Sequence, residues 1–266
     1  MLRALKLDFI NDRIKALACA PGEIPELDVG DLMQQKSFGK IIVLAGDSNW
    51  QDFLDHGFSL EAVHKNYFRG RPGYYLARYP CPGRGTSRQT AKADRLLADV
   101  LKFPASLPDA SLPPAFSLRD AGLADIPQLV ELYKKVFTSY PVPITDQDYM
   151  QETMQTKNHF KIILHRNKIV SAASAEMDAN NLTAELTDCA SLPEYRGRGL
   201  MSKLIQALEE EMRRRKFISV YTIARATGKG INLIFRKQGY EYGGRFINNC
   251  TICGSFEDMN LWHKKL

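Results

Sequence analysis

The sequence predicts an α/β (α+β) fold in which a mixed, mostly antiparallel sheet is flanked by helices. Apolar runs of strand length alternate with amphipathic helices along the 266 residues, and the hydrophobic content of 44% permits a full core. Three strand-like segments, His159–His165, Lys168–Met177 and Leu182–Ser191, follow one another with short turns between them, which predicts antiparallel pairing. A glycine-rich turn then opens a strongly amphipathic helix, and another strand follows that helix.

Residues 1–103 predict a smaller α/β region. Lys40–Ala45 is an apolar run of strand length, and Asp47–Asn49 offer caps for a helix that Gly57 ends. The other expected elements are strands at Met1–Ile10, Phe58–Phe68 and Gly73–Tyr79, helices at Leu27–Lys36, Trp50–His56 and Thr90–Lys102, and a loop at Pro80–Gln89. Residues 104–115 hold Pro104, Pro108, Pro113 and Pro114 without helical or strand periodicity, so they are the predicted linker.

Residues 116–266 predict a second and larger domain. Phe116–Arg119 is a short strand, and Asp125 with Pro127 begins a helix whose apolar face continues to Phe137. The remaining expected elements are a helix at Asp146–Thr156, the three strands named above, the helix from Leu200, a strand at Phe217–Ala224, a helix at Ile231–Gln238, and strands at Tyr240–Asn248 and Asp258–Lys264.

Composition narrows the class of protein. No apolar run approaches the roughly 20 residues that span a bilayer, and the charged start does not resemble a signal peptide, so we expect a cytoplasmic protein without a membrane partner. The net charge of +6 suits a phosphate-bearing small ligand, whereas no base-stacking motif or basic arm favours nucleic acid. Five cysteines argue against a secreted disulfide scaffold, and Cys250–Cys253 forms a lone C-x-x-C pair, so no metal is expected. The composition is compatible with a homodimer.

The glycine-rich turn is the strongest functional signal. Gly197 and Gly199 permit a tight bend just ahead of a helix, where main-chain N–H groups and the positive helix end suit a phosphate or pyrophosphate. Arg196 and Arg198 add positive charge. The alternative is an ordinary strand-to-helix connection that binds nothing.

The order of elements from Phe116 resembles the GNAT acetyltransferase superfamily, whose glycine-rich turn holds the pyrophosphate of acetyl-CoA. The family pattern is Arg or Gln, two residues, Gly, one residue, then Gly or Ala, and Arg196, Gly199 and Met201 occupy its fixed positions. Met201 departs from the small residue of the pattern. The resemblance implies a strand that splays from its neighbour and binds the pantetheine. It assigns the co-substrate to Cys189, Ala190, Ser191, Arg196, Gly197, Arg198, Gly199, Leu200 and Met201, with Asn232 and Phe235 from the later helix.

Longer strings resemble the β-lysine N-acetyltransferases, which make the compatible solute Nε-acetyl-β-lysine. These strings are Ala184–Gly197, Tyr221–Ala226, Asn248–Asn249 and Gly254–Asn260. We therefore expect acetyl transfer to the ε-amine of a small amino acid by direct attack in a ternary complex. A polyamine or protein-lysine acetyltransferase and a non-catalytic acyl-CoA sensor are the alternatives.

The N-terminal region carries a pattern like that of the last strands. Lys40–Tyr79 predicts strand, helix, Gly57–Phe58 and two strands, and Ser219–Lys264 predicts the same with Gly239–Tyr240. We hypothesise a degenerate GNAT half-repeat without a pyrophosphate turn, kept to pack on or cover the catalytic domain. Chance similarity between short α/β units is the alternative.

Acetyl transfer needs a base, because an amine attacks a thioester only when it is neutral. Glu185, Thr187 and Cys189 share one face of the predicted strand, and Asp188 points to the other face unless a bulge intervenes. Glu185 is the first candidate and Asp188 the second. The family's usual tyrosine acid is in doubt, because Phe235 aligns with it.

Recognition of β-lysine requires groups for a carboxylate and for a second amine. Arg225, Asn248 and Asn249 are the candidates for the carboxylate, and Asp146, Glu257 and Asp258 for the amine. Tyr140 is a candidate for the acceptor entrance. Asn248–Asn249 equally fit a turn, and Glu257–Asp258 equally fit the start of a strand.

Overall fold

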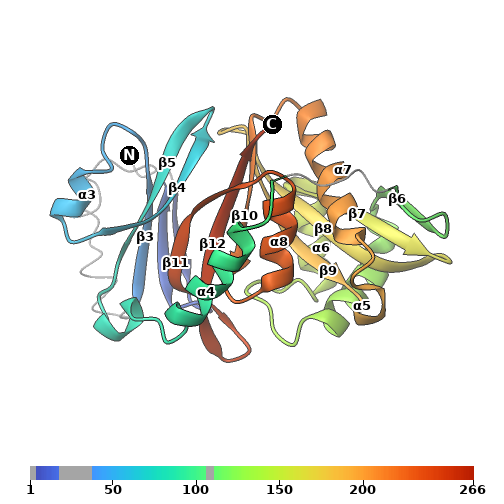
Figure 1. The fold of residues 1–266 in the computed structure, drawn as a ribbon, viewed down its shortest axis with the longest axis horizontal. Coiled ribbons are helices and arrows are strands. Elements are labelled where there is room, and N and C mark those ends of the chain that lie inside the picture. The colour runs from blue at the N-terminus through green and yellow to red at the C-terminus, as the bar shows by residue number, and fades with distance from the viewer. Residues whose placement is uncertain (1–3, 18–37, 106–110) are drawn as a thin grey trace.

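The computed structural model describes residues 4–17, 38–105 and 111–266, and within them one sheet of 12 strands runs through both predicted regions (Figure 1). The strands are β1 (Ala4–Asp8), β2 (Arg13–Leu17), β3 (Lys40–Ala45), β4 (Ser59–Phe68), β5 (Arg71–Arg78), β6 (Phe116–Asp120), β7 (Asn158–His165), β8 (Lys168–Asp178), β9 (Thr183–Ser191), β10 (Ser219–Arg225), β11 (Glu241–Ile252) and β12 (Ser255–Lys265). The α-helices are α3 (Asp52–Asp55), α4 (Thr90–Leu101), α5 (Ile126–Val136), α6 (Gln147–Thr156), α7 (Leu200–Arg214) and α8 (Lys229–Lys237).

The sheet is mixed and mostly antiparallel, as predicted. Its strand order is β1-β2-β3-β5-β4-β11-β12-β10-β9-β8-β7-β6. Among the described strands, β2 with β3 and β9 with β10 are parallel, and the other neighbours are antiparallel. The C-terminal half (residues 116–266) supplies β6 to β12, and the N-terminal half (residues 4–101) supplies β1 to β5.

Helices α5 and α7 both pack on β8 and β9 and form the largest core with them. Residues 169–175 of β8 are all buried, as expected for a strand that is covered on both faces. In α7, Leu204, Ile205 and Leu208 are fully buried, which confirms the predicted apolar face of this helix.

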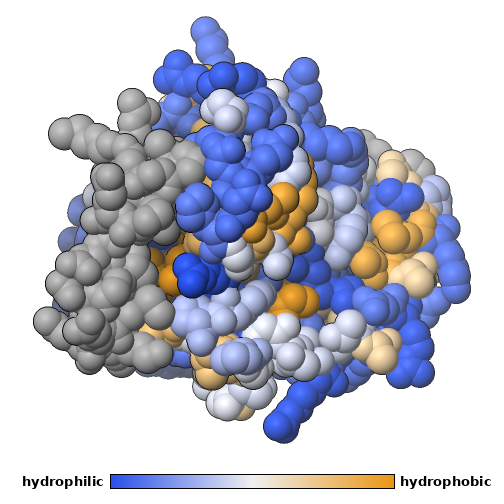
Figure 2. Space-filling model, turned by 90° about the vertical axis from the view of Figure 1, so that its left-hand side faces the viewer, coloured by the Kyte–Doolittle hydropathy of each residue, from blue (hydrophilic) through white to orange (hydrophobic). Residues whose placement is uncertain are grey.

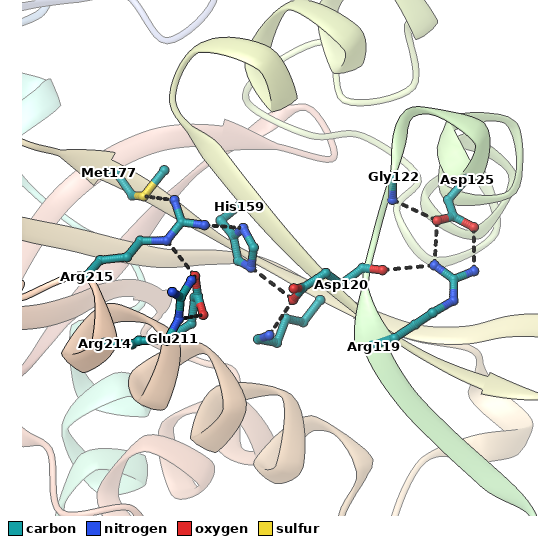
Figure 3. Close-up of polar contacts among 10 residues, drawn as sticks. Arg119, Asp120, Gly122, Asp125, His159, Met177, Glu211, Arg214 and Arg215 are labelled. Carbon is teal, nitrogen blue, oxygen red and sulfur yellow. Dashed lines mark hydrogen bonds and ion pairs between the residues drawn. The ribbon is translucent and has the colours of Figure 1, made fainter.

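The far end of α7 is fixed by charged side chains (Figure 3). Glu211 accepts hydrogen bonds from Arg214 Nη2 and Arg215 Nε, both at 2.6 Å. Arg215 also lies 3.1 Å from His159 Nδ1, and His159 Nε2 lies 3.0 Å from Asp120 Oδ1. These contacts tie the C-terminal end of the helix to β6 and β7.

The two halves join where β4 meets β11, at the pair Ala62 and Gly244. Beyond this join β4 also packs against β12, β10 and β9, so the sheet folds back on itself. Side chains from both halves meet on the resulting inner face, which we define by Ile42, Leu44, Ala62, Tyr67, Tyr75, Phe246, Cys250, Ile252, Met259 and Leu261, with Leu17, Phe68, Tyr221 and Ile223 packed against them.

The β4–β5 hairpin reaches across to the turn between β8 and β9. Arg69 donates from its main-chain N to Asn181 O at 3.0 Å and from Nε to Asn180 O at 2.8 Å. Tyr67 Oη donates to Asp178 Oδ2 at 3.4 Å. The N-terminal half is therefore fastened over the inner face at two separate places.

The outer surface of the N-terminal half is largely hydrophilic, with small separate hydrophobic patches in the view of Figure 2. No helix of the described residues is long and apolar enough to cross a membrane.

Several expected elements differ from those observed. The strand expected at Met1–Ile10 is shorter, and the chain turns back as β2, which was not expected. The last strands form one long hairpin around Cys253–Gly254, where the expected strands ended at Asn248 and began again at Asp258. Asn248 has φ of +44° within a bulge of β11, and this irregularity breaks the alternation of side chains. The helix expected at Leu27–Lys36 and part of the 104–115 linker lie outside the described residues.

The join between β4 and β11 predicts a sharp requirement for glycine. A Cβ at Gly244 would lie 2.3 Å from Glu61 O and 2.5 Å from Ala62 Cα, and φ at this residue is +140°. We expect Gly244→Ala to lower the free energy of unfolding by about 2–4 kcal/mol. Urea denaturation measures this, with Gly46→Ala as the matched control, because a Cβ at Gly46 meets nothing within 4 Å. Equal stability of the two variants would contradict the prediction.

Candidate active site

The glycine-rich bend presents a row of unpaired main-chain donors. Gly197 and Gly199 both have φ of +75°, and a Cβ at either residue would meet nothing within 4 Å. Within the described residues, no group accepts a hydrogen bond from the main-chain N–H groups of residues 197–202. Helix α7 begins at Leu200, so its positive end adds to these donors. The bend therefore fits the pyrophosphate of acetyl-CoA.

The side chains around the bend divide into two sets. Arg196 and Arg198 are exposed; Arg196 Nε donates to Ser191 O at 3.2 Å, and the Arg198 guanidinium lies over the Tyr195 ring at 5.6 Å. Leu200 and Met201 are buried in the core. The Met201 side chain therefore packs in the core and does not line the bend.

Strands β9 and β10 splay apart beside the bend. Their parallel pairing ends at Glu185 and Tyr221, although both strands continue. On its other edge β9 stays paired with β8 as far as Ser191. Cys189, Ala190 and Ser191 therefore lie on a free edge toward β10, as the resemblance implies for the pantetheine.

Asp188 lies in a β-bulge on this free segment, with φ of +52° and its side chain buried. Its carboxylate accepts hydrogen bonds from Ser174 Oγ at 2.6 Å and Tyr140 Oη at 3.0 Å. Burial raises its pKa to about 6, against the lowering effect of these two donors. Tyr140 therefore contacts Asp188, the second candidate for the base, directly.

Glu185 marks the last paired position before the splay. Glu176 of β8 lies directly opposite it, and Tyr221 is its partner in β10. Burial, followed by the negative charge of Glu176, raises the pKa of Glu185 to about 7, whereas the charge of Lys15 and a hydrogen bond from Tyr221 act to lower it. A half-buried carboxylate that titrates near neutrality is suited to exchange protons.

The two helix residues expected at the co-substrate have structural roles here. Asn232 is fully buried, and its Nδ2 donates to Arg225 O at 2.9 Å and Gly228 O at 2.8 Å. Its Oδ1 accepts from Asn260 Nδ2 at 2.9 Å and Trp262 Nε1 at 2.8 Å, which leaves no group of this amide free. Phe235 is buried against Tyr240. We therefore remove both side chains from the candidate site.

Three of the expected acceptor residues are used elsewhere. Asp146 is exposed and caps α6, accepting from Tyr149 N at 2.9 Å. Asn248 Nδ2 donates to Arg84 O and Thr86 O at 3.0 and 3.1 Å, so it holds a loop. Asp258 Oδ1 accepts from Asn248 N at 2.7 Å and fixes the bulge of β11. These contacts give the three side chains structural roles, and Asp258 Oδ2 is buried without a hydrogen-bond partner among the described residues.

The other expected acceptor residues gather near Cys250. The charges of Arg13, Lys15, Arg225 and Glu257 all act on the pKa of the Cys250 thiol, which burial raises. Asn249 O accepts from Arg13 Nη1 at 2.6 Å, and the Asn249 side chain has a buried oxygen without a described partner. Arg225 and Glu257 are half-buried. Two basic residues of the N-terminal half and two expected acceptor residues thus lie close enough to Cys250 for their charges to act on it.

Sequence reasoning missed the residues that other strands bring to Glu185. Glu176, Lys15, Tyr67 and Tyr75 lie on β8, β2, β4 and β5. The position of Glu176 in the predicted meander was the one available signal, since pairing with Leu182–Ser191 places a residue of that strand opposite Glu185. The contribution of the N-terminal half depends on how the sheet folds back, which the sequence pattern does not contain.

The comparisons with known proteins agree with this geometry. Residues 126–240 match the model of the acetyltransferase (GNAT) family. The chain is 37% identical over 239 residues to N-acetyltransferase YodP of Bacillus subtilis, covering 90% of this chain and 86% of that protein. It is 33% identical over 270 residues to a protein named beta-lysine N(6)-acetyltransferase from Methanococcus maripaludis, covering 98% and 95%.

The chain belongs to the GNAT family. It is an acetyl-CoA-dependent N-acetyltransferase. A protein named beta-lysine N(6)-acetyltransferase from Methanosarcina mazei is also similar, with 34% identity over 87% of this chain and 93% of that protein. Among solved structures, the ribosomal-protein-S18-alanine N-acetyltransferase of Escherichia coli has the same fold, with a TM-score of 0.50 and 15% identity over 56% of this chain and 93% of that chain.

The environment of Glu185 predicts a pH-dependent gain in stability from its neutral analogue. Its pKa is raised in the folded protein, so the ionised form destabilises the fold increasingly as the pH rises from about 4.5 to about 7. We expect Glu185→Gln to melt on the order of 5 °C higher than the unmodified enzyme at pH 8 and at nearly the same temperature at pH 4.5. The exposed Glu194→Gln is the control. A difference in melting temperature that does not change with pH would contradict the prediction.

Proposed function

We propose that this GNAT enzyme transfers the acetyl group of acetyl-CoA to the ε-amine of β-lysine. The position of Glu185 carries the proposal: it is a half-buried carboxylate with a pKa near 7, placed where β9 leaves β10. The names of the two archaeal relatives support β-lysine as the acceptor. Those relatives align over 87% and 98% of this chain, and therefore include much of the N-terminal half that meets the inner face.

The reaction joins the amine nitrogen to the acetyl carbonyl carbon, breaks the carbon–sulfur bond and releases the thiol of coenzyme A. A free lysine-type amine has a pKa near 10.4, so the site must take a proton from it. Glu185 accepts this proton, directly or through a water molecule. Its carboxylate is ionised above about pH 7, and it therefore becomes competent as a base in the physiological range.

Asp188 is the second candidate for the base, but its surroundings favour another role. Both of its carboxylate oxygens already accept hydrogen bonds, from Tyr140 and Ser174. In our proposal Asp188 holds the bulge open. A main-chain N–H on the free edge of Cys189–Ser191 then faces the acyl carbonyl and stabilises the negative charge that develops on its oxygen.

The bend from Arg196 to Met201 holds the co-substrate in this proposal. The unpaired N–H groups of residues 197–202 donate to the pyrophosphate, and Arg196 and Arg198 add positive charge at the surface. The free edge of β9 binds the pantetheine as an added strand would.

A panel of amines tests the proposed function. Thiol release from acetyl-CoA is measured with β-lysine, lysine, spermidine and a lysine-containing peptide. We expect kcat/KM for β-lysine to exceed that for each other amine by about tenfold or more, because lysine carries its second amine on the α-carbon instead of the β-carbon, and spermidine has no carboxylate. Preference for spermidine or the peptide would contradict the assignment of β-lysine, and no release with any amine would leave a sensor of acyl-CoA.

The variant Glu185→Gln serves as the control for mechanism in the same assay. It should lower kcat most strongly near neutral pH, and the rate should lose its dependence on a group with a pKa near 7. A pH–rate profile like that of the unmodified enzyme would remove Glu185 from the role of base.

A further inference from the structure

The turns that follow β1 and β8 are the same in detail. Asp8 accepts hydrogen bonds from the main-chain N and the side chain of Asn11, and the next residue, Asp12, has φ of +49°. Asp178 likewise accepts from the main-chain N and side chain of Asn181, and the next residue, Leu182, has φ of +54°. Each turn thus has an aspartate, an asparagine three residues later, and a left-handed residue after it.

The strands after these turns also follow the same plan. The order β1-β2-β3-β5-β4 matches β8-β9-β10-β12-β11, with the same parallel and antiparallel pairs. Both final hairpins turn through two left-handed residues, Arg69–Gly70 and Cys253–Gly254. The helices before them, α3 and α8, are each followed two residues later by a left-handed glycine, Gly57 and Gly239, with φ of +78° and +84°. Five strands and three turns of the N-terminal half therefore correspond to those of the C-terminal half. This similarity is more extensive than the chance similarity expected between two short α/β units.

This correspondence gives Glu185 a counterpart in the N-terminal half. Asp8 pairs with Arg13 as Asp178 pairs with Thr183, so Lys15 takes the place of Glu185. The pairing with the next strand agrees, since Lys15 pairs with Ile42 as Glu185 pairs with Tyr221. In the C-terminal half two acidic residues, Glu176 and Glu185, lie opposite each other on paired strands. In the N-terminal half two basic residues, Lys6 and Lys15, take these positions.

Lys15 and Glu185 both face the inner face. Lys15 shares its side of β2 with Leu17 and is in register with Ile42, and both of these pack at the inner face. Tyr221, the partner of Glu185, packs there too, and its ring lies 6.0 Å from that of Tyr67. The charge of each group also acts on the pKa of the other, in agreement with their positions on the two sides of the inner face.

The ammonium group of Lys15 is available for a ligand, in contrast to its neighbour Arg13. Arg13 Nε pairs with Asp8 Oδ2 at 2.8 Å, and its Nη1 donates to Asn249 O at 2.6 Å. No described residue forms a hydrogen bond or ion pair with Lys15 Nζ. Burial and the charge of Arg13 lower the pKa of Lys15 to about 8, so it is still mostly cationic at neutral pH.

We propose that the N-terminal half is a degenerate copy of the catalytic unit and that Lys15, its counterpart of Glu185, binds the carboxylate of the acceptor. This inference rests on the proposed function, since it assigns one group of that acceptor. β-Lysine carries its carboxylate and its ε-amine at opposite ends, and the inner face offers a lysine from one half and a glutamate from the other. Binding the carboxylate would orient the ε-amine toward Glu185 and the splayed strands.

Steady-state kinetics of Lys15→Gln with two acceptors test this inference. For β-lysine we expect KM to rise about 10- to 100-fold, because an ionic hydrogen bond to the carboxylate is lost. For β-lysine amide, which has no carboxylate, KM should be nearly the same in the variant and the unmodified enzyme. Lys92→Gln, an exposed change on α4, removes the same charge and is the matched control.

A second readout separates binding from a merely structural role. The charge of Lys15 lowers the pKa of Glu185, against the raising effects of Glu176 and Asp188, so Lys15→Gln should move the acidic limb of the pH–rate profile with the amide to higher pH. Thermal melting checks that the variant is folded. If Lys15→Gln does not fold, Lys15→Met replaces it, because methionine keeps the apolar length of the lysine side chain without its charge.

The possible outcomes distinguish a failure of the role proposed for Lys15 from a failure of the proposed function. If the unmodified enzyme acetylates β-lysine but both Lys15 variants fold and keep its KM, the role of Lys15 is overturned and the proposed function stands. An equal rise in KM for acid and amide would also overturn it. If the unmodified enzyme does not acetylate β-lysine at all, the proposed function fails, and this inference fails with it.

Discussion

The site depends on the point at which β9 stops pairing with β10. Hydrogen bonding between the two strands ends at Glu185 and Tyr221, and a bulge in β9 follows at Asp188. A non-glycine residue at φ of +52° costs on the order of 1 kcal/mol, so the surrounding contacts must maintain it. The hydrogen bonds from Tyr140 and Ser174 to the Asp188 carboxylate supply that support. The free edge of β9 and the unpaired amides of the bend are therefore built into the fold.

The folding back of the sheet brings a second set of charges to the same place. Gly244 permits the close approach of β4 and β11, and the β4–β5 hairpin then reaches the turn after β8. The inner face consequently holds Lys15 and Glu185 at partly buried positions, where each loses solvation. Such charges destabilise a fold unless they are paired, and a ligand with both an amine and a carboxylate would complement them. In this account the N-terminal half helps to choose the acceptor.

Local patterns predicted the parts of the structure that local chemistry determines. Lys40–Ala45 is observed with the expected bounds, and α4 differs from its expected range by one residue, because apolar runs and helix periodicity act within a segment. Strand β2 was missed for a physical reason. The strand has only five residues, and the charged side chains of Arg13 and Lys15 lie on a side that packs inside the protein, whereas a sequence pattern assigns such a side to solvent.

The site shows the same division between local and long-range information. The bend at Arg196–Met201 depends on consecutive residues and could be located from its glycines. The candidates for acceptor binding were chosen from sequence similarity and residue type, which do not tell where the side chains point. In the structure Asp146 caps a helix, Asn248 bonds to a loop, and Asp258 bonds to the bulge of β11. The approach of Lys15 to Glu185 links residues 170 positions apart, and seven strand pairs lie between β2 and β9 in the sheet that brings them together.

A crystal structure of the enzyme with coenzyme A and β-lysine tests the central claim most directly. The claim is that the co-substrate lies in the splay between β9 and β10 and that the acceptor lies between the two halves. The account predicts the pyrophosphate on the amides of residues 197–202, the ε-amine next to Glu185 and the carboxylate at Lys15. A coenzyme bound away from the bend, or β-lysine bound only by the C-terminal half, would contradict it.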